Sequence, residues 1–337
     1  MPTSNVSSAA SASGAAAFTA FTAATLRPAE RPTFYFIGVT TGSSSIQRVF
    51  PAWAAELGLD ARMQGIDLPI HAPDDQYRRV VEFIRDDPGS LGALVTTHKI
   101  DLYRAARDLF DERDFFAELT GETSCISKRA GGLVAHAKDP ISSGLALDAF
   151  IPAGYWSSHP GATAVAMGAG GSTVAMSWYL TQPGRGDDRP AEFVVTNRSQ
   201  PRLDSLRRIH GRLGADTPFR YEHCPRPELN DALVSSQPAG SLIVNATGLG
   251  KDAPGSPITD AAVFPRGGFA WDLNYRGELV FLDQAKAQAA AAGLTVEDGW
   301  VYFLHGWTQV IAEVFQIEIP TAGPQFDRLS ELARAAR

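Results

Sequence analysis

The sequence predicts an α/β protein with two domains. One reason is its length, because 337 residues suit two hydrophobic cores better than one. A second is an alternation of strand-like and helix-like segments, which starts at Thr33 and begins again at Ala162. Strands that alternate with helices form parallel sheets with helices on both faces. A third is a glycine-rich turn, Gly168-Ala169-Gly170-Gly171, between a strand and a helix of the second series.

Composition narrows the class of protein. Hydrophobic residues at 44% and charged residues at 20% are typical of a soluble globular chain. A formal charge of −7 argues against a nucleic-acid partner, because nucleic acids bind to positively charged protein surfaces. Cys125 and Cys224 are the only cysteines, so we expect a reducing, cytoplasmic location and neither a disulfide framework nor a CxxC metal site. No apolar run approaches the roughly 20 residues of a membrane span, so no membrane partner is expected.

Residues 1–31 differ from the rest of the chain. They are rich in Ala, Ser and Thr, and the first basic residue is Arg27. A signal peptide would begin with a charged segment, which is missing. We expect a disordered tail, with an arginine-poor transit peptide as the alternative.

Residues 32–150 form the first alternating series. Hydrophobic side chains recur every three to four residues in the helical segments, and β-branched and aromatic residues cluster in the strand-like ones. Strands are expected at 33–39, 91–96, 123–128 and 133–136, and helices at 46–57, 77–84, 100–109 and 142–150.

Residues 151–299 form the second series, and two further helical patterns end the chain. Strands are expected at 164–167, 192–196, 241–245 and 269–273, and helices at 173–180, 203–213, 279–292, 301–315 and 326–336.

The glycine-rich turn predicts a dinucleotide site. A buried strand precedes Gly168 and a helix starts after Gly171. Glycines let the backbone approach a pyrophosphate, which binds free N–H groups at the helix N-terminus, where Ser172 also lies. Thr173 stands where the third glycine of a G-x-G-x-x-G pattern usually falls. An ordinary glycine-rich connection is therefore the alternative.

The strand that follows ends on Asn197, Arg198 and Ser199, which favours NADP over NAD. An NAD site usually has an acidic residue here to bind the ribose 2′-hydroxyl. A guanidinium instead suits a 2′-phosphate, because it donates two parallel hydrogen bonds. Arg202 is a second candidate contact. The alternative is that Arg198 only caps an exposed loop.

Further motifs follow in a fixed order. They are Val95-Thr96-Thr97-His98-Lys99, Lys138-Asp139, Asn245-Ala246-Thr247-Gly248-Leu249-Gly250 and Asp272-Leu273-Asn274-Tyr275. With the glycine turn and the Asn197 segment, they resemble the shikimate and quinate dehydrogenases from about residue 34 to about residue 316.

The resemblance implies an N-terminal substrate domain, a C-terminal NADP domain of the Rossmann type and a cleft between them. The substrate domain would span 32–150 and be completed by helices in 300–337, and the NADP domain would span 151–299. Cofactor contacts are expected from the turn at Gly168, Ala169, Gly170, Gly171 and Ser172, from Asn197, Arg198 and Ser199, and from Ala246, Thr247, Gly248 and Leu249.

Lys99 and Asp139 match the lysine and the aspartate of that family, which implies that they move the proton. Hydride transfer to a ketone needs a proton donor, and burial would lower the pKa of a lysine toward neutrality. Both residues follow predicted strands, where open α/β sheets place their clefts. Asp139 could instead cap a helix before Pro140, and His98 is an alternative acid or base. No histidine spacing suggests a metal site.

The residues expected to bind substrate are Ser43, Ser44, Thr96, Ser124, Tyr275 and Gln309. Several depart from the family. Ser44 matches the first serine of its Ser-x-Ser-Pro carboxylate loop, but Ile46 replaces the second. Ser124 replaces an asparagine, and Gly306 a glutamine for which Gln309 is the nearest substitute. Such changes should alter specificity, because polar sites reject substrates that leave their groups unpaired.

We therefore expect an NADP-dependent dehydrogenase, active as a monomer or homodimer on shikimate or a related cyclic hydroxy acid. Lys138 could meet a displaced carboxylate or be a solvated charge. The alternatives are an amino-substituted or otherwise altered ring substrate, and a non-catalytic NADP sensor.

Overall fold

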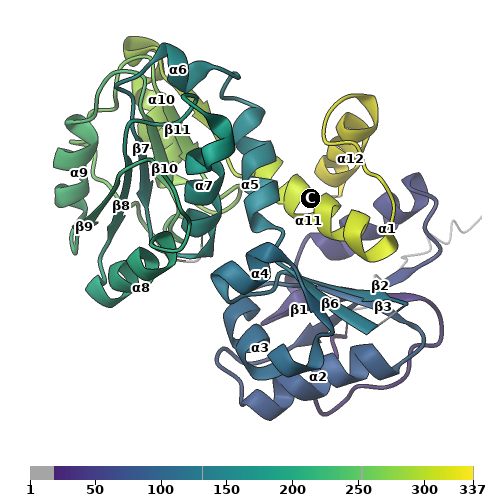
Figure 1. The fold of residues 1–337 in the computed structure, drawn as a ribbon. Coiled ribbons are helices and arrows are strands. Elements are labelled where there is room, and N and C mark those ends of the chain that lie inside the picture. The colour runs from purple at the N-terminus through teal and green to yellow at the C-terminus, as the bar shows by residue number, and fades with distance from the viewer. Residues whose placement is uncertain (1–18, 131, 252, 337) are drawn as a thin grey trace, which may run out of the picture.

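The computed structural model describes residues 19–130, 132–251 and 253–336. Figure 1 shows two lobes, one containing β6 (Gly132–His136) and the other β7 (Ala164–Met167). The helices α5 (Asp139–Asp148) and α11 (Trp300–Phe315) lie where the lobes meet (Figure 1). Within the described residues each lobe contains one six-stranded sheet. The predicted α/β fold with two domains is therefore confirmed.

The sheet of the first lobe is mixed, with the strand order β2-β1-β3-β5-β6-β4. The expectation of a parallel sheet is wrong here, because β5 runs antiparallel to both β3 and β6. A short connection such as the one between β5 and β6 can join only antiparallel strands. The remaining strands are β1 (Thr33–Gly38), β2 (Arg62–Asp67), β3 (Ser90–Val95), β4 (Glu112–Arg113) and β5 (Cys125–Arg129).

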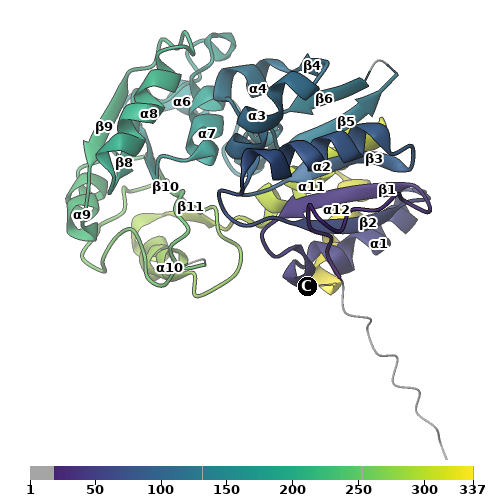
Figure 2. The same cartoon turned by 90° about the horizontal axis from the view of Figure 1, so that it is seen from below.

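Helices cover both faces of this sheet. One face packs against α2 (Asp74–Asp86) and α3 (Lys99–Ala106), and the other against α1 (Ile46–Glu56), α11 and α12 (Pro324–Ala335). The C-terminal helices thus bury their apolar sides on the sheet that the N-terminal half forms, as Figure 2 shows from below. Shorter elements are η1 (Thr41–Ser43), η2 (Arg107–Leu109) and α4 (Phe115–Thr120).

The second sheet is parallel throughout, with the order β12-β11-β10-β7-β8-β9. This is the doubly wound order of dinucleotide-binding sheets, in which ligands bind at the point where the order reverses. That point lies between β7 and β10. The other strands are β8 (Phe193–Asn197), β9 (Phe219–His223), β10 (Leu242–Asn245), β11 (Phe269–Asp272) and β12 (Thr295–Glu297). The helices are α6 (Tyr155–Ser158), α7 (Gly171–Thr181), η3 (Pro183–Arg185), α8 (Gln200–His210), α9 (Pro227–Ser235) and α10 (Val280–Ala292).

The strands that the sequence did not predict are the four edge strands of the two sheets, β2, β4, β9 and β12. Arg62–Asp67 contains only two large apolar residues, and Phe219–His223 is half-buried or exposed along its length. An edge strand has one neighbour and often one wet face, so its hydrophobic pattern is weak. α4, α6 and α9, of six, four and nine residues, are short enough to lack a clear helical period.

The expected disordered tail is wrong for residues 19–31. Phe21 is 8% exposed and pairs with Ile66 of the edge strand β2. The Phe21 N–H donates to the Gly65 carbonyl at 2.9 Å, and the Asp67 N–H donates to the Phe21 carbonyl at 2.8 Å. An unpaired strand edge offers these hydrogen bonds to any extended segment that reaches it. Residues 1–18 lie outside the described residues.

The two lobes meet along α5, α7 and α11. Gly144 of α5 lies against the ring of Tyr179 of α7, so close that an added Cβ would stand 2.4 Å from ring carbons. The Tyr179 hydroxyl donates a hydrogen bond to Asp148 at the end of α5. Glycine at position 144 is therefore required by a close approach between helices of the two lobes.

Two kinds of feature are missing from the part of the chain that the structure describes. None of its helices combines the length and the apolar content that a membrane crossing requires. Nor do three His, Cys, Asp or Glu side chains within it gather closely enough to hold a metal ion.

Candidate active site

The ends of β3 and β6 bring Lys99 and Asp139 together. The two strands run in the same direction, because β5 is antiparallel to both. Lys99 is the first residue of α3 and Asp139 the first of α5. Lys99 Nζ donates a hydrogen bond to Asp139 Oδ2 in an ion pair whose side chains are 24% and 14% exposed. Lys138, not Asp139, occupies the N-cap position, so the carboxylate of Asp139 is directed at the lysine instead of capping its helix.

Lys99 holds its proton more tightly than the sequence predicts. Burial lowers the pKa of Lys99, but the negative charges of Asp139 and Glu122 outweigh it and raise the pKa above its ordinary value. The expected shift toward neutrality is therefore wrong, because burial was considered without the charges of Asp139 and Glu122. At neutral pH this site holds an ammonium ion, which is a proton donor.

Glu122 is a third charged group of the site. It is 4% exposed, and burial raises its pKa to about 7, with the charge of Lys99 opposing that rise and the charge of Asp139 adding to it. An added Cβ on Gly171 would lie 2.9 Å from Glu122 Oε2. A carboxylate of the first lobe thus lies against the start of α7 in the second.

Tyr302 of α11 completes this group. Its hydroxyl lies 3.4 Å from Ser172 Oγ at the start of α7, and burial raises the pKa of the phenol, with a further rise from Asp139. Sequence reasoning missed Glu122 and Tyr302. The signal available was a carboxylate just before the buried strand β5, since buried acids are rare unless they are paired.

His98 and Lys138, two titratable neighbours of the pair, have structural roles. His98 is 1% exposed, and its Nδ1 lies 3.1 Å from the Tyr77 hydroxyl. Burial lowers its pKa, and it does not line the cavity beside Lys99. Lys138 was expected to meet either solvent or a substrate carboxylate. Its Nζ instead pairs with Glu313 Oε2 of α11 at 2.5 Å, which ties the C-terminal helix to the strand end that carries Asp139.

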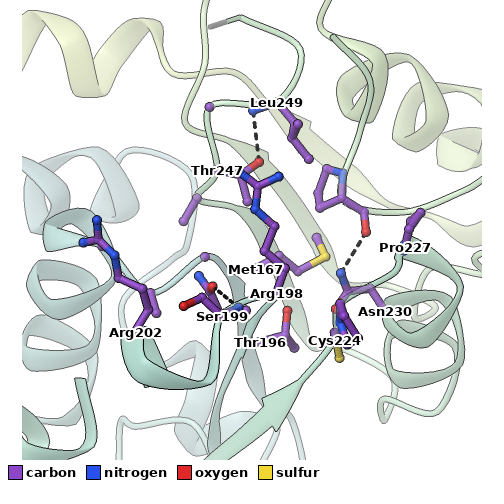
Figure 3. A pocket seen from close by; sticks show the side chains of 18 of the residues that line it. Met167, Thr196, Arg198, Ser199, Arg202, Cys224, Pro227, Asn230, Thr247 and Leu249 are labelled. Atoms are coloured by element: carbon purple, nitrogen blue, oxygen red, sulfur yellow. Dashed lines mark hydrogen bonds between the residues drawn. The ribbon is translucent and has the colours of Figure 1, made fainter. Parts of the chain in front are cut away.

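A cavity of about 560 Å³ lies at the reversal point of the second sheet, and Figure 3 shows side chains around it. Gly168, Ala169 and Gly170 line it, and open space stands before Gly170 where a side chain would be. Gly168 has φ 122°, and an added Cβ there would lie 2.5 Å from the Ala246 carbonyl oxygen. The turn therefore needs glycine at 168 and leaves room for a bulky ligand at 170.

Thr173 explains how the turn dispenses with a third glycine. Its side chain is fully buried, and its hydroxyl donates to the Gly168 carbonyl at 2.7 Å. The hydroxyl thus satisfies a carbonyl of the turn, which supports the turn conformation from within α7.

Three arginines line the cavity beyond the end of β8. Arg198, Arg202 and Ser199 line the cavity at the end of β8 (Figure 3), and Arg226, which the sequence did not single out, joins them from the loop after β9. Asn197 stabilises the turn at the end of β8, since its Oδ1 accepts a hydrogen bond from the Ser199 N–H at 2.8 Å. Three guanidinium groups, open space at the turn and a helix N-terminus fit the charge and the size of NADP.

A buried polar network fixes the loop that follows β10. Asn245 Nδ2 donates to Asp272 Oδ1 at 3.1 Å, and Asn274 Nδ2 donates to the Thr247 and Leu249 carbonyls, both at 3.1 Å. The Thr247 hydroxyl donates to Asn245 Oδ1 at 2.6 Å. Ala246, Thr247, Gly248 and Leu249 all line the nucleotide cavity as expected, and Asn274 is a further residue on which their placement depends.

A second cavity, of about 370 Å³, lies between the lobes and contains Lys99 and Asp139. Of the residues expected to bind substrate, Thr96, Ser124 and Tyr275 line it. Ser43, Ser44 and Gln309 do not. Ser43 is exposed, and its hydroxyl donates to the Thr40 carbonyl of its own turn at 2.8 Å. Ser172, expected at the cofactor, lines this second cavity and not the nucleotide cavity, and Gly171 lines neither.

The two cavities share Ala246, Thr247 and Gly248. A dinucleotide that starts at the arginines and crosses the glycine turn would therefore end beside the lysine–aspartate pair. Fold and site together define a two-domain, dinucleotide-dependent oxidoreductase.

Comparison with known proteins gives the family. The shikimate dehydrogenase (NADP(+)) of Hahella chejuensis (strain KCTC 2396) is 30% identical over 242 residues, which are 69% of this chain and 78% of the relative. That of Paracidovorax citrulli (strain AAC00-1) is 28% identical over 206 residues, 60% of this chain and 66% of the relative. The crystal structure of shikimate 5-dehydrogenase from Thermus thermophilus, in complex with NADP(H) and shikimate, has a TM-score of 0.65 at 23% identity and covers 90% of this chain and 99% of that one.

No protein-family model matches the chain. The relative from Hahella chejuensis is 30% identical and is covered over 78% of its length, which is sufficient to assign the family. The chain belongs to the shikimate dehydrogenase family, as a divergent member.

Proposed function

We propose that this protein catalyses reversible hydride transfer between NADP(H) and a secondary alcohol or ketone on a shikimate-type ring. One observation carries the proposal, namely that the nucleotide cavity and the Lys99–Asp139 cavity share the loop 246–248. The curated relatives, which are named for shikimate and NADP(+), support the same cofactor and substrate type.

The residues of the two cavities would have different roles, one set binding the cofactor and the other transferring the proton. Arg198, Arg202 and Arg226 would hold the 2′-phosphate, and the start of α7 the pyrophosphate. NADPH supplies the hydride when it is bound. In ketone reduction Lys99 Nζ would donate its proton to the carbonyl oxygen as negative charge develops there, and the lysine would regain a proton from solvent. Asp139 would orient the ammonium and keep it charged until that step, as the raised pKa of Lys99 favours.

We also propose the domain limits expected from the sequence, 32–150 with 300–337 and 151–299. Their support is the composition of the cores, since Leu304, Trp307 and Val310 pack with the strands of the first sheet. Val301 and Tyr302, at the start of α11, pack against the second core instead. The first turn of α11 therefore belongs to the junction of the two domains.

The proposed function is tested by following NADPH absorbance with shikimate, quinate, aminoshikimate and their keto forms. Lys99→Ala should lower kcat by roughly 10²–10⁴-fold, the usual effect of a general acid or base. Lys286→Ala, which removes an exposed lysine of α10, should leave the rate unchanged. Turnover that survives Lys99→Ala near the wild-type rate would contradict the role of Lys99. Tight NADP binding without turnover of any compound would favour the sensor alternative.

A further inference from the structure

Glu122 is a buried carboxylate at the junction of the lobes that the proposed hydride transfer does not use. It follows Gly121, which ends α4 of the first lobe in the left-handed conformation with φ 69°. Phe116 of α4 packs edge-on against Trp178 of α7 in the second lobe, with ring centroids 4.4 Å apart (Figure 2). The end of α4 therefore brings Glu122 to the second lobe.

The carboxylate of Glu122 lies against the first residue of α7. A Cβ added to Gly171 would stand 2.9 Å from Glu122 Oε2 and 3.4 Å from its Oε1. Glycine at position 171 thus lets the carboxylate approach the start of the helix. Gly171 lines neither cavity, but its neighbour Gly170 lines the nucleotide cavity. The carboxylate and the cavity are therefore next to adjacent residues of one turn.

Two negative groups meet at this helix N-terminus when the cofactor binds. The pyrophosphate of a dinucleotide binds the N–H groups at the start of the helix that follows the glycine turn, and here that helix is α7. A helix N-terminus stabilises an anion beside it, but a second anion within about 4–6 Å raises the pKa of the first. An ionised Glu122 would therefore weaken the binding of the pyrophosphate, and a neutral one would not.

The surroundings of Glu122 keep its two protonation states close in free energy near neutral pH. Burial raises its pKa to about 7, the charge of Lys99 of α3 opposes that rise, and the charge of Asp139 of α5 adds to it. Lys99 and Asp139 are themselves joined in an ion pair. A further negative charge at the start of α7 would consequently shift the equilibrium of Glu122 toward the neutral acid.

The other elements around Glu122 supply no group that would titrate in its place. α7 contains no Asp, Glu, Lys, Arg or His. Tyr302 of α11 interacts with Glu122, but burial raises the pKa of this phenol, which stays neutral. On α4 itself, Glu118 is 40% exposed and forms ion pairs with two arginines. Arg212, after α8, donates a hydrogen bond to the Leu119 carbonyl at 2.9 Å.

We propose that Glu122 takes up a proton when NADP(H) binds, so that it is neutral in the complex and partly ionised in the free protein. It is a positioning residue of the cofactor site, because it lines neither cavity and acts on the pyrophosphate through its charge at the start of α7. The inference rests on the NADP site and goes beyond the proposed hydride transfer. By linkage, the cofactor should bind most tightly below pH 7 and less tightly as the pH rises through that value.

Dissociation constants of NADP⁺, measured by calorimetry between pH 6 and pH 9, test this inference. The Kd of the wild type should rise by roughly tenfold over this range relative to that of Glu122→Gln, which is the effect of a shift of one unit in a pKa. Glu112→Gln, the same change at an exposed position of β4, should follow the wild type. His223, whose Nε2 lies 3.1 Å from the Arg198 carbonyl oxygen, and the 2′-phosphate also titrate, but they are present in every comparison and cancel.

Proton uptake on binding provides a second readout, and a merely structural role of Glu122 would not change it. Titrations near pH 7.5 in HEPES and in Tris, whose ionisation enthalpies differ, should show that the wild type takes up roughly half a proton more than Glu122→Gln. Equal uptake and parallel pH profiles of Kd in the two proteins overturn the inference. If Glu122→Gln does not fold, absence of uptake by the wild type overturns it. Uptake as expected without turnover of any substrate supports the inference and contradicts only the proposed function.

Discussion

At the scale of single residues, the proton-transfer pair lies beside a further buried carboxylate, Glu122. Lys99 and Asp139 form one ion pair, and Glu122 is a second buried carboxylate that adds to the rise in the pKa of Lys99. A lysine with one carboxylate partner in a buried site can have its pKa shifted either way. The charge of Asp139 opposes the effect of burial most strongly and Glu122 adds to it, so the pair favours an ammonium donor at neutral pH.

Glu122 predicts a pH dependence of stability. Burial raises its pKa from the ordinary 4.5 to about 7, so the folded protein holds this proton more tightly than the unfolded chain. Its contribution is full below pH 4.5 and is lost as the pH rises through 7. Between pH 5 and pH 8 the free energy of unfolding of the wild type should therefore fall relative to that of Glu122→Gln by roughly 1–3 kcal/mol.

Urea unfolding of both proteins at several pH values measures this difference. Asp272, whose pKa burial raises to about 6, contributes in the same direction to both proteins and cancels in the comparison. Glu112→Gln, at an exposed position of β4, should follow the wild-type profile. Parallel profiles for the wild type and Glu122→Gln would show that Glu122 is ionised when folded.

At the scale of elements, the segment before β1 acts as a cover for a sheet edge. Phe21 lies over β2, packs into the core that α2 and α3 share, and exchanges backbone hydrogen bonds with Gly65 and Asp67. Composition alone placed this segment in a disordered tail, because most of the residues around Phe21 are small or polar.

Phe21→Ala should destabilise the protein by about 3 kcal/mol, the usual cost of removing a buried phenylalanine. Phe115, which is 64% exposed, provides the matched control, and Phe115→Ala should cost under about 1 kcal/mol. Thermal or urea unfolding measures both. Equal effects of the two substitutions would mean that the 19–31 segment does not pack on β2 in solution.

At the scale of the whole molecule, the two lobes meet along α5, α7 and α11, and the two cavities that share residues 246–248 form one long site across both domains. α11 begins at the second core and ends in the first, and the salt bridge between Lys138 and Glu313 fixes it beside α5. Each domain supplies one part of the active site. The second holds the dinucleotide cavity, and the first holds Lys99 and Asp139.

Cofactor preference should be visible as a stabilisation of the whole protein. NADPH at a hundredfold excess over its Kd should raise the free energy of unfolding by about 2.7 kcal/mol. At the same concentration Arg198→Ala should lose about 1.5 kcal/mol of this effect or more, because a hydrogen bond to a charged group contributes roughly 1.5–3 kcal/mol. NADH should stabilise both proteins alike.

Thermal-shift titrations with the two cofactors test this prediction. Arg208→Ala is a suitable control, because Arg208 is an exposed residue of α8 that does not line the cavity. An unchanged preference for NADPH in Arg198→Ala would transfer the role to Arg202 or Arg226.

The sequence by itself determined the features that are encoded in contiguous residues. The glycine turn, the Asn197-Arg198-Ser199 strand end and the inner strands each have a local pattern, because turn geometry and burial on both faces constrain neighbouring residues directly. Lys99 and Asp139 could be named because each directly follows such a strand.

Only the tertiary structure decided the features that depend on segments packed from elsewhere. The antiparallel β5, the four edge strands, Arg226 and the position of Glu122 behind Lys99 all depend on which elements become neighbours. The same is true of the cavity beside Lys99, since α11 reaches it from some 200 residues beyond Lys99. Pairing at edges, the direction of a pKa shift and the character of a cavity arise from contacts across the fold, and no local pattern records them.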